Sequence, residues 1–134
     1  MEAFDFDLRI LVVDDMATMR KINTQILNRI GFKNVKAAAD GKEAWEMIIG
    51  ALGLGLSFGL VITDWNMPVM TGLDLLSQIR NEPRTKELKV LMVTAEGEKE
   101  NILLAVKAGV NNYIVKPFTP ETLNLKLKKI FDIK

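Results

Sequence analysis

The chain has 134 residues, of which 49% are apolar and 26% are charged. This length and composition suit one folded domain and exclude a disordered or low-complexity chain. The absence of histidine and cysteine excludes zinc hydrolases, Ser-His-Asp hydrolases, histidine phosphocarriers and disulfide frameworks. A net charge of +1 provides no basic field, so we expect no nucleic-acid partner.

The longest apolar stretch, from Met47 to Leu60, is interrupted by glycines. A membrane-spanning helix needs about 20 consecutive apolar residues, so this stretch is too short. The N-terminal residues 1–7 are acidic and lack the basic region of a signal peptide. We therefore expect a soluble, cytoplasmic protein without membrane contact.

Five short segments rich in Val and Ile predict buried strands, because each ends at polar or turn residues. In chain order they are Leu8–Val13, Val35–Ala38, Leu60–Thr63, Val90–Val93 and Tyr113–Val115. Apolar residues at helical spacing follow each strand and predict five helices with one buried face each. The predicted faces are Ile22, Ile26 and Ile30; Trp45, Ile48 and Ile49; Leu75, Leu76 and Ile79; Ile102, Leu103 and Val106; and Leu123, Leu127 and Ile130.

Strand and helix therefore alternate five times, and the strands are too apolar to leave one face in water. Gly31 and Gly109 stand where helices should end, and Thr119-Pro120-Glu121 has the order of a helix start. This pattern predicts a doubly wound α/β fold, in which helices cover both faces of a five-stranded parallel sheet. Since no linker or repeat is visible, we expect a single domain.

Polar residues follow four of the predicted strands. Asp14 and Asp15 follow the first strand, Asp64 the third, Thr94 the fourth and Lys116 the fifth. These side chains converge if the first and third strands are neighbours, because ligands bind at the carboxyl ends of parallel strands. Three carboxylates need a cation, and Mg²⁺ prefers oxygen ligands. An aspartate can attack phosphorus while a lysine and a hydroxyl hold the phosphoryl oxygens, so the set predicts phosphoryl-transfer chemistry.

Each residue of this set also has a simpler interpretation. Asp14 and Asp15 could cap the next helix, and Asp64 could begin a turn. Thr94 could be a cap, and Lys116 a solvated charge. Their joint placement at four strand ends favours the functional interpretation.

These segments resemble the receiver domains of response regulators and, within that family, the single-domain CheY-like chemotaxis regulators. The resemblance rests on residues 11–15 (LVVDD), 18–20 (TMR), 63–68 (TDWNMP), Met70, Gly72, 91–96 (LMVTAE) and 112–119 (NYIVKPFT). It implies a flavodoxin/CheY-like fold with strand order 2-1-3-4-5 and five helices. It also implies that residues 1–134 form one receiver domain without an output domain, and that the protein is a monomer.

The resemblance implies roles for the residues at the strand ends. Asp64 would be phosphorylated, and Thr94 and Lys116 would bind the phosphoryl oxygens. Mg²⁺ would be held by Asp15, by Asp64 and by the backbone carbonyl of Asn66, with Asp14 holding a metal-bound water. The peptide bond before Pro117 would be cis, and the side chains of Asn66 and Glu96 would tune the rate of dephosphorylation. The protein would not be an enzyme beyond self-catalysed phosphotransfer and autodephosphorylation.

The implied partners are a CheA-like histidine kinase, a flagellar motor switch protein and a dedicated phosphatase. The partner face would comprise Gly97, Lys99, Ile102, Tyr113, Val115, Lys126 and Lys129, with Tyr113 as an aromatic switch. An acidic amphipathic helix would suit this face. Without the resemblance, Tyr113 reads as a half-buried strand residue and the lysines as solvated charges.

Two other functions stay open beside the motor-binding switch. One is a stand-alone receiver that acts as a phosphate sink or relay; the other is an aspartate-nucleophile phosphatase. The phosphatase is disfavoured because Asp14 and Asp15 are adjacent rather than separated by one residue. Two departures from the family pattern are Met16-Ala17 and a longer, apolar connection at residues 50–58, which we interpret as an extended helix end packed on the core rather than a binding patch.

Overall fold

Five parallel strands form one sheet in the computed structural model, which describes residues 4–95 and 99–133. The strands are β1 (Arg9–Val13), β2 (Asn34–Ala38), β3 (Leu60–Asp64), β4 (Lys89–Ala95) and β5 (Asn112–Lys116). The helices are α1 (Ala17–Ile30), α2 (Gly41–Gly53), α3 (Gly72–Asn81), α4 (Lys99–Lys107) and α5 (Pro120–Ile130). The strand order is β2-β1-β3-β4-β5, which confirms the predicted α/β fold and the order implied by the resemblance.

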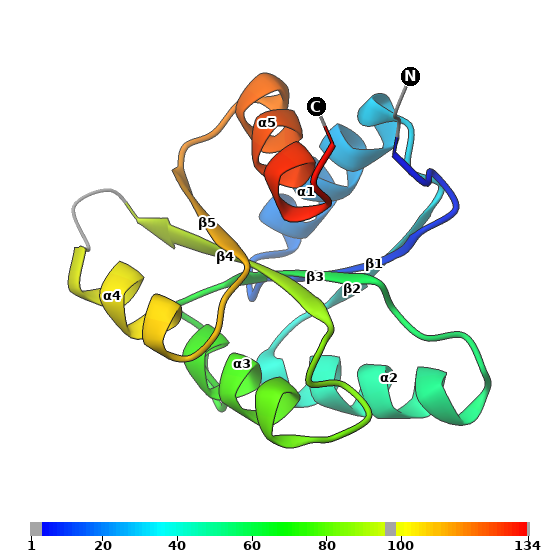
Figure 1. Cartoon of the computed structure of the whole chain (residues 1–134). Helices are drawn as coiled ribbons and strands as arrows, with labels where there is room; N and C mark the ends of the chain where they lie inside the picture. The colour runs from blue at the N-terminus through cyan, green and yellow to red at the C-terminus, as the bar shows by residue number, and fades with distance from the viewer. Residues whose placement is uncertain (1–3, 96–98, 134) are drawn as a thin grey trace.

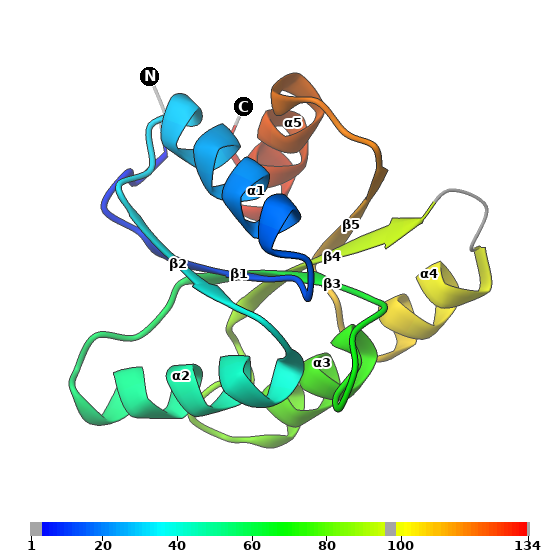
Figure 2. The ribbon, with the colours of Figure 1, turned by 180° about the vertical axis from the view of Figure 1, so that it is seen from behind.

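Helices cover both faces of this sheet: α1 and α5 lie on one face, and α2, α3 and α4 on the other (Figures 1 and 2). Alternate residues of each strand point to opposite faces and supply two cores. Leu11 and Val13 of β1 belong to the core that includes α2 and α3 side chains, whereas Ile10 and Val12 belong to the core of α1 and α5. The parallel pairing of β1 with β3 brings the carboxyl ends of both strands to the same end of the sheet.

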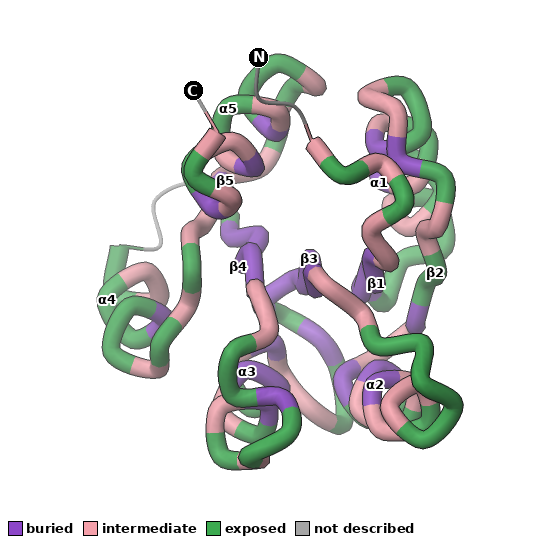
Figure 3. The backbone as a smooth tube through the Cα atoms, turned by 45° about the vertical axis from the view of Figure 1, so that its right-hand side comes forward, coloured by how far each residue is buried: buried purple, intermediate pink, exposed green. Residues whose placement is uncertain are grey.

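The outer strands, β2 and β5, are more exposed to solvent than predicted. Strands β1, β3 and β4 are almost entirely buried, but Lys36 and Ala37 of β2 are exposed and most of β5 is only half-buried (Figure 3). Because Lys36 and Ala37 point to opposite faces while Ala38 and Val35 pack into the two cores, β2 is exposed at two positions but does not have one face in water. An edge strand has a neighbour on only one side, so the helices cover it incompletely.

Two predicted helix faces are only partly correct: Ile26 and Ile30 of α1 pack against the core as predicted, but other residues of the two faces do not. In α1 the buried residues are Asn23 and Leu27, while Ile22 is 40% exposed, because residues one position apart are rotated by about 100° around a helix. In α4 the buried residue is Ala105, and Leu103 and Val106 are exposed. The predicted faces of α3 and α5 are confirmed. Among the described residues, no helix combines the length and apolar composition that a membrane span requires.

Residues 50–58, interpreted from the sequence as an extended helix end packed on the core, agree with that interpretation only in part. Helix α2 does extend to Gly53, and Phe58 packs against the core. Leu54 and Leu56, however, are 76% and 43% exposed, so the end of the helix and the following turn are not packed on the core.

A side chain that the sequence patterns did not single out links three segments at the end of the sheet where the strands begin. The guanidinium group of Arg80, in the last turn of α3, donates to the carbonyl oxygens of Lys86 (3.1 Å), Leu88 (2.6 Å) and Gly109 (2.9 Å). It also donates to Oδ1 of Asn111 (2.8 Å), which accepts the Val90 N–H as well (2.7 Å). Arg80 therefore fixes the loops before β4 and β5 against α3.

Gly72, the first residue of α3, should not tolerate a side chain. A Cβ atom there would lie 2.3 Å from the backbone oxygen of Asp64 and 2.9 Å from Sδ of Met92. We expect Gly72→Ala to lower the free energy of unfolding by about 1–3 kcal/mol, measured by urea denaturation. Gly50→Ala in α2 is the matched control: its Cβ meets no atom within 4 Å, and the helix should gain about 0.5–1 kcal/mol. If Gly72→Ala and Gly50→Ala lowered the free energy of unfolding equally, the inference that Gly72 has no room for a side chain would be wrong.

Candidate functional site

Asp14 follows β1 and is held by contacts with two neighbouring elements. Its side chain is buried, with 1% of the residue exposed, and its Oδ1 accepts the backbone N–H of Met16 at 2.9 Å. Its backbone N–H donates to Ala38 of β2 at 3.2 Å, and its carbonyl oxygen accepts Nη1 of Arg20 at 2.7 Å. Asp15 is exposed. Helix α1 begins after Met16 without a side-chain cap, so the interpretation of these acids as helix caps is wrong.

Asp64 is the last residue of β3 and is 8% exposed. Its Oδ1 accepts the backbone N–H of Trp65 at 2.9 Å, which fixes the direction of the carboxylate. The pKa of Asp64 is raised above 3.8 because burial disfavours the charged form; Lys116 partly opposes this effect, and Asp14 adds to it. The carboxylate is thus costly to ionise in the metal-free protein.

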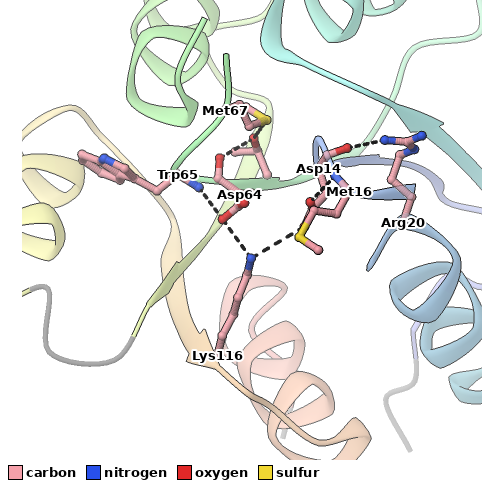
Figure 4. A network of polar contacts seen from close by, with 8 residues as sticks. Asp14, Met16, Arg20, Asp64, Trp65, Met67 and Lys116 are labelled. Atoms are coloured by element: carbon pink, nitrogen blue, oxygen red, sulfur yellow. Dashed lines mark hydrogen bonds and ion pairs between the residues drawn. The ribbon is translucent and has the colours of Figure 1, made fainter. Parts of the chain in front are cut away.

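Lys116, the last residue of β5, reaches both acids, as Figure 4 shows. Its Nζ lies 3.2 Å from Oδ1 of Asp64 and 3.7 Å from Oδ2 of Asp14. The peptide bond from Lys116 to Pro117 is cis, as the resemblance implied. Only part of the lysine is accessible, at 27% of its side chain, so one cation faces two buried carboxylates. This placement contradicts the interpretation of Lys116 as a solvated charge.

Thr94 lies in β4 and is 1% exposed. Its Oγ1 has no hydrogen-bond partner; among the buried side-chain nitrogen and oxygen atoms of the described residues, this is true only of Thr94 Oγ1 and Asn23 Oδ1. Leaving a buried hydroxyl unpaired costs about 1–3 kcal/mol, so a partner supplied by a ligand would relieve this cost. The hydroxyl therefore does not act as a cap.

The carboxylates of Asp14, Asp15 and Asp64 offer oxygen atoms that all lie within 4.8 Å of one another. Three negative oxygen ligands at this spacing fit a small hard cation such as Mg²⁺. The structure thus brings together Asp14, Asp15, Asp64 and Lys116, and Thr94 directly follows Val93, the β4 residue that pairs with Asp64. Asn66 follows in an exposed position after Trp65, and Glu96 lies outside the described residues.

The predicted partner face is formed by α4, β5 and α5, which are neighbours in Figure 1. Tyr113 is half-buried, and Nζ of Lys126 lies 4.6 Å from the centre of its ring. The pKa of Lys126 is lowered, first by burial and then by repulsion from Lys129. The remaining residues of the face are partly or fully exposed: Lys99, Ile102, Val115 and Lys129. Gly97 lies outside the described residues.

Replacing Asp64 with Asn should stabilise the metal-free protein at neutral pH. The raised pKa means that ionisation of Asp64 disfavours the folded state; this penalty is absent below the unfolded pKa of 3.8 and grows as the pH rises through the folded pKa. In EDTA at about pH 7 we expect Tm to rise by about 2–4 °C, and the difference to shrink toward about pH 4. A mutant less stable than wild type at neutral pH would show that the ion pair with Lys116 outweighs burial.

Known proteins are similar to this chain both in sequence and in fold. Residues 10–128 match the family model of the response regulator receiver domain. The chain is 48% identical over 123 residues to chemotaxis protein CheY1 of Helicobacter pylori, covering 92% of this chain and 96% of that protein. It is 47% identical over 125 residues to chemotaxis protein CheY of Pseudomonas aeruginosa, covering 93% and 97%.

Solved structures agree with this assignment. Chemotaxis response regulator CheY4 of Vibrio cholerae is similar with a TM-score of 0.80 and 34% identity, over 92% of this chain and 98% of that chain. A response regulator from Chloroflexus aurantiacus has a TM-score of 0.85 and 32% identity, over 94% and 98%. The chain therefore belongs to the receiver-domain family of response regulators.

Proposed function

We propose that this protein is a phosphorylation-dependent switch of a two-component system, with Asp64 as the acceptor. The observation that carries the proposal is the buried Asp64 carboxylate, 3.2 Å from Nζ of Lys116, beside two further acids. The unpaired Thr94 hydroxyl supplies a hydrogen-bond donor that the metal-free site does not use. A carboxylate, a cation and a free hydroxyl are the groups that acyl-phosphate formation requires.

In the proposed step, an oxygen of Asp64 attacks the phosphorus atom of a phosphohistidine on a CheA-like kinase. The new P–O bond forms as the P–N bond breaks, and the bonding electrons leave with the imidazole nitrogen. Lys116 and Thr94 bind the phosphoryl oxygens. Mg²⁺, held by Asp15, Asp64 and the Asn66 carbonyl with Asp14 nearby, supplies charge neutralisation when bound. Hydrolysis of the acyl phosphate resets the switch, at a rate tuned by the side chains of Asn66 and Glu96.

The protein's own chemistry would be limited to this phosphotransfer and to autodephosphorylation, so we do not propose a separate enzyme activity. Asp14 is buried and bonded to the Met16 N–H, whereas Asp15 is exposed. The two adjacent acids therefore lie in different environments. In an aspartate-nucleophile phosphatase, one residue separates the nucleophile from the second acid, which serves as general acid. Asp14 and Asp15 are directly adjacent and do not have this spacing.

We further propose that phosphorylation is read by a flagellar motor switch protein in the cytoplasm. The support is the 47–48% identity to proteins named for chemotaxis. Thr94 lies opposite Val115 in the β4–β5 pairing, two residues from Tyr113. A move of Thr94 toward the phosphoryl group would make room for the Tyr113 ring, and Lys126, which covers that ring, would meet an acidic partner helix.

Phosphorylation should depend on Asp64 and on the metal ligands. After incubation with acetyl phosphate and Mg²⁺, intact mass spectrometry should show one added phosphoryl group on the wild type and none on Asp64→Asn. Asp15→Asn, which alters an exposed ligand, should slow labelling by at least about tenfold. Asp132→Asn is the control and should be labelled like wild type. Labelling of Asp64→Asn at the wild-type level would refute the assignment of the acceptor.

Partner binding should depend on the face formed by Tyr113 and Lys126. Tyr113→Ala and Lys126→Glu should each weaken binding of the phosphorylated protein to the motor switch protein by about tenfold or more, measured by calorimetry. Labelling by acetyl phosphate should stay unchanged. Lys21→Glu, an exposed reversal on α1, is the control. Unchanged binding in both variants, with intact phosphorylation, would favour the phosphate-sink or relay function instead.

A further inference from the structure

A cavity of about 450 Å³ lies between the beginning of the sheet and the end of α2. Its lining comes from three segments: the first residues of β1 and β2, the last turns of α2, and the connection to β3. Asp64, by contrast, closes β3 at the other end of the sheet. The cavity is therefore separate from the phosphorylation site.

The cavity exists because α2 carries small residues where it faces the edge of the sheet. Gly50 and Ala51 line it, and a Cβ atom on Gly50 would meet nothing within 4 Å. Larger apolar side chains complete the lining: Val35, Met47, Leu54, Leu56 and Phe58. Leu54 and Leu56 are 76% and 43% exposed, on the stretch that Figure 3 draws as exposed after α2. A ligand with an apolar body would cover this surface.

The charges that line the cavity all have one sign. Arg9, Lys33 and Lys36 contribute to the wall, and no acidic residue of the described chain does. Among the described residues, the ion pair that reaches this rim joins Oδ1 of Asp7 to Nζ of Lys33 at 3.7 Å; both side chains are largely exposed, so this ion pair is weak. The end of α2 adds only the partial negative charge of a helix C-terminus. The charged side chains of the lining are therefore all basic, which favours an anion.

We propose that this cavity binds a small organic anion with an apolar body, such as a medium-chain carboxylate. The carboxylate would lie among Arg9, Lys33 and Lys36, and the hydrocarbon chain would run along Met47 and Leu54. The volume falls within the range of about 300–1,000 Å³ that is typical of small-molecule sites. Such a ligand uses both properties of the cavity, the positive rim and the apolar lining.

Amide chemical shifts of the ¹⁵N-labelled full chain test the proposal, with octanoate, octylammonium and octanol as probes. Octanoate should bind saturably with a Kd on the order of 1 mM and shift residues around the cavity. Octylammonium and octanol should bind at least about fivefold more weakly, because they lack the charge that the rim prefers.

Two variants locate the site. Gly50→Leu places a side chain in the open space and should weaken octanoate at least about tenfold, while helix propensity favours its folding. Lys36→Glu should weaken octanoate about fivefold. Lys42→Glu, an exposed reversal at the other end of α2, is the matched control and should bind octanoate normally.

Three results would overturn the proposal. Equal affinity for the three probes would mean an apolar crevice without anion preference. Absence of saturable shifts would mean that the cavity does not hold such a ligand. Octanoate binding that both site variants leave unchanged would place the anion elsewhere. The spectrum of each variant reports its folding in the same experiment.

Discussion

The burial of two acids at the ends of β1 and β3 is the constraint on which the candidate site depends. Asp14 and Asp64 are almost fully buried, and within the described part of the chain the ammonium group of Lys116 alone forms ion pairs with both. Burial disfavours the charge on Asp64 more than Lys116 favours it, so its pKa stays raised. The folded chain therefore holds a site whose charge is incomplete without a cation, and binding there is coupled to folding stability.

Much of the fold could be predicted because its signals are local. Hydrophobic runs identified the strands, and Thr119-Pro120-Glu121 identified the start of α5, where the Thr119 hydroxyl accepts the Thr122 N–H. Exposure was harder to predict, because it depends on neighbours that are distant in sequence. Lys36 is exposed to solvent because β2 lies at the edge of the sheet. Ile22 is exposed because the orientation of α1 on the sheet turns this residue away from the core.

The same division applies to the candidate site. Residue type and position after a strand were enough to select Asp64 and Lys116, because parallel strands bring their ends together. Residue type and strand position could not predict the contacts that hold Asp64 in place. The Trp65 N–H donates to its carboxylate, and Gly72 packs closely against its backbone carbonyl; both contacts depend on three-dimensional geometry. The family resemblance drew attention to Gly72, but only the structure gives a physical reason for a glycine there.

The hydrogen bonds of Arg80 should make evolutionary changes in one loop depend on changes in the other. One planar guanidinium serves carbonyl groups both before β4 and before β5. A lysine could not replace it, because an ammonium lacks the rigid fork of donors. An insertion or deletion in either loop would move its carbonyl away and leave the other loop without a full anchor. In descendants of this sequence, we expect loop lengths at residues 82–88 and 108–111 to change together, or only after Arg80 has been lost.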